Sequence, residues 1–362
     1  MNRLRVALLA GGRGVRMEKL GHKRPKPLIP YGGMCHLIDF SISNVYQSGI
    51  DEILLLSQYK DKQLVRYLME TWAFSDTFRV HFGPFNDVYH ENIDSVFKRV
   101  KRAEEFGTAD ALIKNNAYIF SEEFTDVMVL HSDHVYNFHY QKMLDYHRKE
   151  NAALTIGYKE IDREDVKLFG MVEVDRNENL LSFVEKPTHP KCNTVFTAVC
   201  IFNSKKLIDY LDRLQKTNWN YDVSKDIIPA MLQGREVIKC FYFQDHWEDI
   251  GTVKRYYQSN MNLLKEDATF CYDDLPLTLY TEIKRHFIKE KEKIKNTVVA
   301  ENARCEGTIT NSIIYPYVFI SKDSYIRDSI ILPGARIEGK SYIENAIIIE
   351  DEMLKDKQVT II

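Results

Sequence analysis

A cluster of glycine and basic residues near the N-terminus could bind a phosphate-rich anion. A short apolar run, 6–10, leads into five such residues: Gly11, Gly12, Arg13, Gly14 and Arg16. Glycines let the backbone approach a bulky anion, and each guanidinium group can donate two hydrogen bonds at once to phosphate oxygens. Because a buried strand that runs into such a loop is a common anion-binding arrangement, the pattern predicts a triphosphate-binding loop.

Two commoner glycine loops do not fit this stretch. A Walker loop requires a lysine followed by Ser or Thr, and a dinucleotide fingerprint requires a third glycine where Met17 stands. A plain glycine-rich turn is the alternative, but two arginines and the nearby Lys26-Pro27 pair favour anion binding.

Two lysines could neutralise the charge of bound phosphates. Lys26 and Lys186 each precede a proline, which fixes the local backbone and so the position of the lysine. Phosphoryl transfer requires positioning and charge neutralisation more than covalent chemistry, so both lysines suit it. Read singly, each lysine is a solvated surface charge.

Two carboxylates are candidates for a Mg²⁺ site. Asp133 and Asp249 each follow an apolar strand, and Mg²⁺ prefers one or two carboxylates together with substrate phosphates. A zinc site of His131, Asp133 and His134 is an alternative, disfavoured because adjacent side chains on an extended segment point in opposite directions. Asp133 could also be an ordinary helix cap.

The elements that must position these residues alternate between strands and helices, which is typical of a parallel sheet with crossover helices. We expect strands over 6–10, 52–56, 126–130, 153–158, 195–202 and 237–243, and a hairpin of 170–174 and 180–184. We expect helices over 37–47, 62–72, 107–120, 140–150, 205–215 and 253–265, and we assign no element between 74 and 106. Ligands of such sheets bind beyond the carboxyl ends of the strands.

The C-terminal part has a different period. Isoleucine or leucine recurs every six residues at Ile314, Ile320, Ile326 and Leu332, and a second series from Ile331 is shifted by one residue. A six-residue period suits a triangular parallel β-helix, with a small ordinary sheet as the alternative. We therefore predict a catalytic domain over 1–264, a linker over 265–296 and a β-helix domain over 297–362.

The composition narrows the functional class. A hydrophobic content of 44%, a charged content of 28% and a net charge of -3 are typical of a globular protein without a general nucleic-acid surface. The six cysteines form no C-x-x-C pair, which argues against a zinc site or a disulfide framework. No apolar run approaches the ~20 residues of a membrane span and the first strand begins at once, so we expect a cytoplasmic protein.

A series of motifs, together with the six-residue repeat, carries a family resemblance. In chain order they are L-A-G-G-R-G-V-R-M, K-R-P-K-P, L-I-D-F-S-I-S-N, G-T-A-D-A, S-D-H-V-Y, F-G-M-V, F-V-E-K-P and W-E-D-I-G-T. The chain resembles the sugar-1-phosphate nucleotidylyltransferases, most of all bacterial glucose-1-phosphate adenylyltransferase. The resemblance implies an α/β fold, with a Rossmann-like (GT-A-type), mostly parallel sheet and a C-terminal left-handed β-helix.

The resemblance also implies a role for each matching residue. The reaction would join a nucleoside triphosphate and a sugar 1-phosphate, release pyrophosphate and require Mg²⁺ on Asp133 and Asp249. The catalytic residues would be Arg16, Lys26 and Asp133. The nucleotide would be bound by Gly11, Gly12, Arg13, Gly14, Arg16, Gly107 and Asp110. The sugar phosphate would be bound by Gly170, Glu185 and Lys186. Lys23 would belong to a regulatory site, and the protein would be a homo-oligomer, a tetramer or a dimer.

Several segments depart from the adenylyltransferase pattern, beginning with 36–40, which reads H-L-I-D-F in place of R-I-I-D-F. The A-Q-Q segment is replaced by 82–86, the W-Y-R segment by 104–106 and the S-M-G-I-Y strand by 196–200. We expect ATP and glucose 1-phosphate as substrates, with GTP and a cyclitol phosphate, such as valienol 1-phosphate, as the alternative. A non-catalytic regulatory subunit and a hexapeptide acyltransferase are further alternatives, although the latter usually needs a β-helix histidine and none follows His286.

Overall fold

A computed structural model describes residues 3–10, 15–57, 62–72, 77–84, 92–102, 106–120, 124–276, 278 and 284–360. The predicted anion-loop residues 11–14, and parts of the departing segments 82–86 and 104–106, lie outside these ranges. The chain forms two compact units, and each is described by itself. The first contains 1–11, 44–132 and 136–247, and the second contains 12–43, 133–135 and 248–362.

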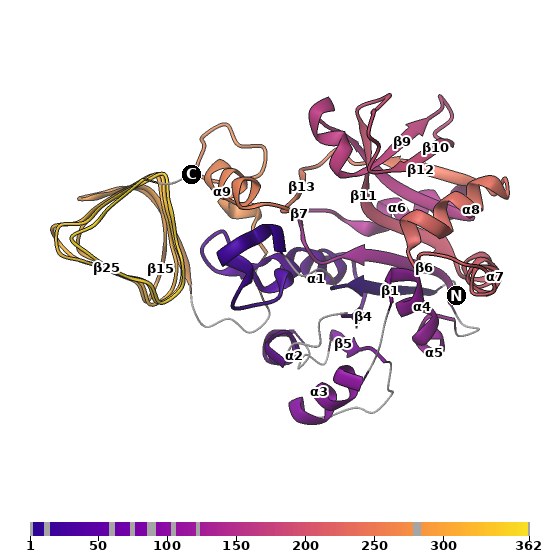
Figure 1. Ribbon diagram of the computed structural model, residues 1–362, viewed down its shortest axis with the longest axis horizontal. Coiled ribbons are helices and arrows are strands. Elements are labelled where there is room, and N and C mark those ends of the chain that lie inside the picture. Colours follow the sequence, from indigo (N-terminus) through magenta and orange to yellow (C-terminus); the bar gives the residue numbers. More distant parts are fainter. Residues whose placement is uncertain are drawn as a thin grey trace. The chain divides into compact units, whose positions relative to one another are not determined.

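The first unit is built on one large sheet. Its strand order is β10-β9-β11-β6-β1-β4-β5, with β8 beside β11 and β12 beside β8. The strands are β1 (Arg3–Leu9), β4 (Glu52–Leu56), β5 (Arg79–Phe82), β6 (Phe124–His131), β8 (Leu154–Glu160), β9 (Gly170–Val174), β10 (Leu180–Glu185), β11 (Thr194–Asn203) and β12 (Ile238–Tyr242). Strands β4, β5 and β6 run parallel to β1 or to each other, as the alternating pattern predicts. Figure 1 shows β11, β6, β1 and β4 side by side.

Helices of the first unit complete its core. They are α2 (Lys62–Thr71), α3 (Ile93–Arg102), α4 (Thr108–Lys114), α5 (Asn116–Ile119), α6 (Tyr140–Lys149), α7 (Ser204–Leu214) and α8 (Ile228–Gln233), and α1 (Leu37–Gln47) belongs to both units. Apolar residues of β1, β4, β6 and β11 pack with residues of α4, α7 and α8 in one buried cluster. The helix expected over 107–120 is interrupted at Asn115, whose side-chain amide donates to the carbonyl of Ala111.

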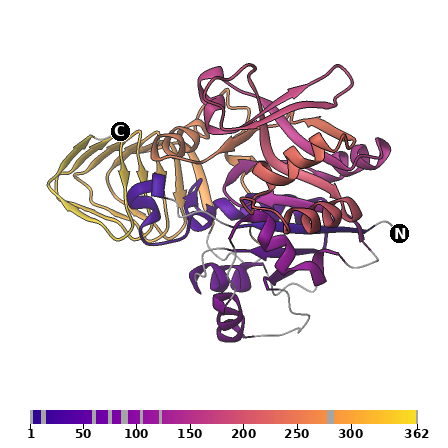
Figure 2. The same ribbon diagram turned by 45° about the vertical axis from the view of Figure 1, so that its right-hand side comes forward.

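The second unit contains the predicted β-helix, drawn in yellow in Figure 1. Figure 2 shows its successive coils stacked on one another. Ile313 pairs with Ile330 and Ile330 with Ile347, so these coils take 17 residues each, whereas the preceding coil, from Val298 to Ile313, takes 15. A triangular coil of three six-residue sides would need 18, and the missing residue explains the one-residue shift between the two isoleucine series. The fold is therefore α/β with a left-handed parallel β-helix, as predicted.

The strands of this unit are short, as a triangular coil requires. They are β2 (Pro30–Tyr31), β3 (Cys35–His36), β14 (Arg285–Lys291), β15 (Ile294–Ala300), β16 (Arg304–Cys305), β17 (Thr308–Thr310), β18 (Ile313–Ile314), β19 (Phe319–Ile320), β20 (Tyr325–Arg327), β21 (Ile330–Ile331), β22 (Arg336–Glu338), β23 (Tyr342–Glu344), β24 (Ile347–Ile348), β25 (Met353–Lys355) and β26 (Gln358–Thr360). Strands β14 and β15 form an antiparallel pair that includes much of the segment 285–296. The domain limits at 264 and 297 stay a prediction.

The segment that follows the glycine loop packs on the β-helix and on α9 (Val253–Asn262). The Tyr31 hydroxyl shares a hydrogen bond with Ser259, the Gly32 N–H donates to Asn260 Oδ1, and the Tyr256 hydroxyl donates to the carbonyl of Pro30. These bonds hold the backbone a few residues after Lys26.

Two further observations concern the cysteines and the length of the helices. All six cysteines lie in described positions, and none of them is part of a disulfide. Across the described parts of the chain, we find no helix with the length and apolar character that crossing a membrane would require.

A buried histidine in the first unit makes stability depend on pH. His147 on α6 shares a 2.8 Å hydrogen bond with Thr155 and lies 3.7 Å from the carboxylate of Asp126, which also pairs with Arg148. Burial lowers the pKa of His147 to about 4, against the opposing effect of Asp126. The native state therefore excludes a proton that the unfolded chain binds below its ordinary pKa of about 6.5.

We predict that this exclusion costs about 2 kcal/mol of stability between pH 7 and pH 5, because the unfolded state binds more protons in this window. Stability is complete above pH ~6.5 and falls progressively toward pH ~4. Thermal unfolding of the parent and of His147→Gln, each at pH 7 and at pH 5, measures this loss of stability. The parent should lose more stability than the variant on acidification, and equal losses would contradict the assignment.

Candidate functional site

Lys26 lies at the centre of the candidate site in the second unit. It follows Pro25 and begins a short turn, Lys26–Leu28, closed by the Ile29 N–H donating to its carbonyl. The side chain is only 8% exposed. Its ammonium donates a 2.6 Å hydrogen bond to Asp133 Oδ2 and lies 3.5 Å from Asp249 Oδ1. The predicted lysine and both predicted metal ligands therefore meet.

Two paired strands bring the carboxylates together. Strand β7 (His134–Tyr136) begins directly after Asp133, and β13 (Trp247–Asp249) ends at Asp249. The strands form a two-stranded sheet, and the Ile250 N–H donates to the carbonyl of Asp133 over 3.4 Å. Both carboxylates are less than one fifth exposed, so they act on Lys26 with little solvent screening.

The charge of Lys26 is stable in this environment. Burial by itself would lower the pKa of Lys26, but the charges of Asp133 and Asp249 and the hydrogen bond to Asp133 raise it, and the net result lies above the usual value. The nearby guanidinium of Arg16 opposes this effect. Lys26 is therefore an ammonium at neutral pH, as charge neutralisation requires.

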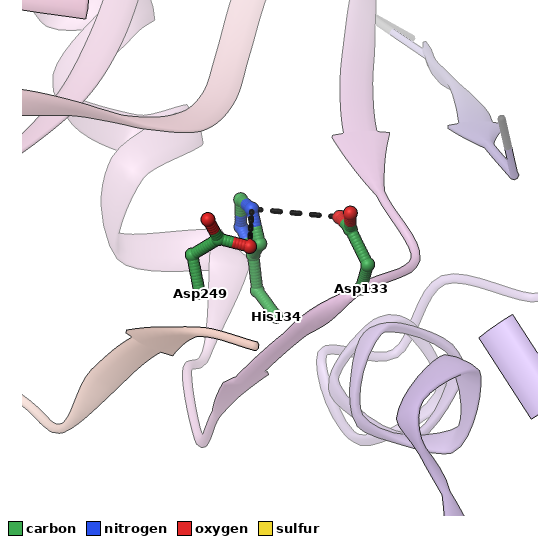
Figure 3. Close-up of side chains that lie close together, drawn as sticks. All are labelled: Asp133, His134 and Asp249. Atoms are coloured by element: carbon green, nitrogen blue, oxygen red, sulfur yellow. Dashed lines mark ion pairs between the residues drawn. The ribbon is translucent and has the colours of Figure 1, made fainter. Parts of the chain in front are cut away.

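His134 joins the two carboxylates in a group that could hold a divalent metal ion. Figure 3 shows its imidazole beside Asp133 and Asp249, and the candidate ligand atoms of all three lie within 4.8 Å of one another. His134 Nε2 is 3.5 Å from Asp133 Oδ1 and 3.9 Å from Asp249 Oδ1. Two oxygen donors and one imidazole fit a divalent cation.

The sequence did not predict this use of His134. The side-chain alternation that disfavours His131, Asp133 and His134 as a zinc site holds only on a regular strand. Asp133 lies in a bend before β7 begins, so its side chain and that of His134 can both approach Asp249. The Asp133-His134 pair at the end of a strand was visible in the sequence. The bend that lets both side chains approach Asp249 was not.

Arg16 lies near Asp249, and Gly251 stands close to both side chains. A Cβ on Gly251 would stand 3.1 Å from Asp249 Oδ2 and 3.7 Å from an Arg16 Nη. The glycine therefore leaves the space between a carboxylate and a guanidinium open. Arg16 itself is exposed, which suits a group that reaches toward a phosphate. Sequence reasoning named Gly251 only as part of a motif.

The three residues predicted for the sugar phosphate come together in the first unit. Gly170 starts β9 and pairs directly with Glu185 at the end of β10. A Cβ on Gly170 would stand 2.7 Å from the ring of Phe183 and 3.1 Å from Glu185 Oε2, so a side chain at this position would have to displace Phe183. Lys186 has a φ of +49°, and its ammonium lies 3.4 Å from Glu185 Oε1. A lysine in this backbone region is strained, which is common at functional sites.

Gly107 and Asp110, two of the residues predicted to bind the nucleotide, have different surroundings. Gly107 precedes α4, and a Cβ there would stand 2.2 Å from the carbonyl oxygen of Tyr221. Asp110 is buried, and its Oδ2 accepts hydrogen bonds from the Phe106 N–H and the Lys114 ammonium.

Lys23, predicted to be regulatory, contacts the β-helix. Its ammonium donates to the carbonyl of Glu350 and lies 3.6 Å from Asp351 Oδ2, and the adjacent Arg24 pairs with the buried Glu350 carboxylate at 2.7 Å.

Comparison with known proteins identifies the family. The model of the nucleotidyl transferase family matches residues 6–266, and that of the GlmU-like C-terminal hexapeptide family matches residues 283–361. The valienol-1-phosphate guanylyltransferase of Streptomyces hygroscopicus subsp. limoneus is 42% identical over 332 residues, 90% of this chain and 89% of the relative.

Two adenylyltransferases are also similar along most of their length. The glucose-1-phosphate adenylyltransferase of Mycoplasma mobile is 32% identical and that of Clostridium beijerinckii is 33% identical. The alignments cover 89% and 90% of this chain and 84% of each relative. With Lys26, Asp133 and Asp249 assembled, the chain is an enzyme of the nucleotidyl transferase family and belongs to its sugar-1-phosphate nucleotidylyltransferases.

Proposed function

We propose that this enzyme transfers a guanylyl group from GTP to a cyclitol 1-phosphate and releases pyrophosphate. The observation that carries the chemistry is the buried Lys26 ammonium between Asp133 and Asp249. The similarity to a valienol-1-phosphate guanylyltransferase, at 42% identity against 32% and 33% for the adenylyltransferases, supports this substrate pair. The departures over 82–86, 104–106 and 196–200 support it as well, since they remove adenylyltransferase motifs.

A specific observation also favours ATP and glucose 1-phosphate as a second candidate pair. The relatives named glucose-1-phosphate adenylyltransferase match about nine tenths of this chain, and the G-T-A-D-A and F-V-E-K-P motifs are intact. Assembly into a homo-oligomer stays a prediction from the resemblance.

The residues of the site would share the work of a phosphoryl transfer. Asp133 and Asp249, with His134 beside them, would hold a Mg²⁺ ion, which supplies positive charge to the phosphate oxygens. Lys26 and Arg16 add fixed positive charge for the triphosphate. Lys186 and Glu185 would bind the phosphate and a hydroxyl of the acceptor. An acceptor phosphate oxygen is already ionised, so it attacks the α-phosphorus without a general base, and pyrophosphate leaves in line.

We expect purified protein with Mg²⁺ to release pyrophosphate from one nucleoside triphosphate only when an acceptor 1-phosphate is present. GTP, ATP, UTP and dTTP should be tested against valienol 1-phosphate and glucose 1-phosphate, with GTP and valienol 1-phosphate the best pair. Lys26→Ala should lower kcat by roughly 100-fold or more, because fixed charge at the reacting phosphates is lost.

The matched control is Lys205→Ala, which removes an exposed lysine of α7. It should retain the parent activity. If no pair turns over above the Lys26→Ala background, the chain is not an active transferase and the regulatory-subunit alternative stands. A best rate with ATP and glucose 1-phosphate would replace the first substrate pair by the second.

Asp133→Asn should weaken the binding of Mn²⁺, used as a probe for Mg²⁺, by roughly tenfold or more, because one charged ligand is lost. Electron paramagnetic resonance of free Mn²⁺ measures this without turnover. Asp267→Asn removes an exposed carboxylate of the same unit and serves as the control. Equal Mn²⁺ affinity of Asp133→Asn and the control would remove Asp133 from the metal site.

A further inference from the structure

Three aromatic side chains of the first unit form a surface that the residues above do not use. Phe106 is 71% exposed and Tyr221 is 37% exposed, while Trp219 is half-buried. The ring centres of Phe106 and Tyr221 are 5.4 Å apart, and those of Trp219 and Tyr221 are 5.0 Å apart. Exposed aromatic rings that cluster in this way mark a binding surface more often than a packing defect.

The loop that carries Tyr221 is rigidly built. The buried carboxylate of Asp226 accepts hydrogen bonds from the backbone and side chain of Asn220 and from the Asp222 N–H. Tyr221, between them, has a φ of +61°. A bulky residue in this region costs free energy and persists only where its surroundings fix it. The loop therefore fixes the backbone from which the Tyr221 ring projects.

The same loop is fastened to the start of α4. The carbonyl of Tyr221 accepts a 2.9 Å hydrogen bond from the Ala109 N–H, and the Val223 N–H donates to Thr108 Oγ1. The close approach excludes any side chain at Gly107, where a Cβ would stand 2.2 Å from the Tyr221 oxygen. Gly107 therefore brings the aromatic loop and the helix start together.

Asp110 fixes the other ring. Its carboxylate accepts hydrogen bonds from the Phe106 N–H (2.8 Å) and from Lys114 (2.7 Å), whose ammonium lies 5.0 Å from the centre of the Phe106 ring. With these partners, Asp110 acts as a positioning residue for Phe106.

The surface lies toward the ligand-binding edge of the sheet. At the end of α4, the amide of Asn115 comes within 3.0 Å of the Cβ position of Gly83, which follows the carboxyl end of β5. Farther along, the Tyr118 ring contacts the Arg5 guanidinium near the start of β1. Helices α4 and α5 therefore run from the carboxyl edge to the amino edge, and α4 begins beyond the carboxyl edge, where open α/β sheets bind ligands.

We propose that Phe106 and Tyr221, backed by Trp219, form the surface on which the purine ring of the nucleoside triphosphate stacks. This inference rests on the proposed function and adds residues that select the nucleotide. A ring surface binds any flat base and favours the larger purines, and it does not distinguish guanine from adenine by hydrogen bonds.

Binding measurements on two substituted proteins test the proposal. Phe106→Ala removes one ring, and Tyr221→Asn removes the other with a residue that tolerates positive φ. Each should weaken the binding of GTP and of ATP by about tenfold, as for the loss of one base-stacking contact. The affinity for inorganic triphosphate should not change, and Phe106→Tyr should retain the parent affinity for GTP. Isothermal titration calorimetry measures each of these affinities.

The matched control is Tyr317→Asn in the β-helix, since Tyr317 is 65% exposed and has a φ of +63°. It should bind GTP as the parent does. Unchanged GTP and ATP affinity in Phe106→Ala and Tyr221→Asn, with an active parent enzyme, would overturn the stacking role and leave the proposed function standing. An equal loss of triphosphate affinity would show a structural role and overturn it too. A parent that binds no nucleoside triphosphate would overturn both proposals.

If the rings instead cover a second copy of the chain, the substitutions would change the oligomeric state in sedimentation and leave nucleotide binding intact. That result would also overturn the proposal.

Discussion

The contact between the Lys26 ammonium and the carboxylates of Asp133 and Asp249 is the constraint on which the second unit depends. A buried ammonium without partners is strongly destabilising, and so is a buried pair of like charges, so the three groups must be held together. They come from three distant segments of the chain. The pairing of β7 with β13 fixes the two carboxylates, and the Pro25 turn fixes the lysine. The ion pairs therefore stabilise this arrangement of segments, and the arrangement in turn positions the charged groups.

The β-helix takes part in this support. The segment after Lys26 is bonded to α9 by Tyr256, Ser259 and Asn260, and it shares one apolar cluster with the coils. Gly33, with a φ of +95°, passes so close that a Cβ would stand 2.8 Å from Val298. Two residues before Lys26, Arg24 pairs with buried Glu350. The β-helix therefore takes part in positioning Lys26, together with the segment that matches the nucleotidyl transferase family.

The sequence predicted the parts whose signal is local. Helix α1 has the predicted bounds 37–47, β4 the predicted 52–56, and the six-residue period gave the β-helix. It missed β5 and α3 inside 74–106, although R-V-H-F alternates and Ile93, Val96, Phe97 and Val100 have helical spacing; both signals are short and surrounded by charge. His134 was missed because its role depends on a bend, and the aromatic surface because the loop of Tyr221 meets α4 across more than a hundred residues.

Three of the segments that depart from the adenylyltransferase pattern lie in a different unit from Lys26, Asp133 and Asp249. The segments 82–86, 104–106 and 196–200 belong to the first unit, whereas Lys26, Asp133 and Asp249 belong to the second, together with the departing segment 36–40. The segment 196–200 illustrates what such a change costs. Ala198 stands where the S-M-G-I-Y strand has glycine, yet it keeps a φ of +59° beside a register shift in β11. A residue with a Cβ is disfavoured in this region by roughly 1 kcal/mol, so alanine is strained at a position where glycine would not be. Residues 82–86, 104–106 and 196–200 therefore differ from the adenylyltransferase pattern outside the unit that contains the ammonium and the two carboxylates.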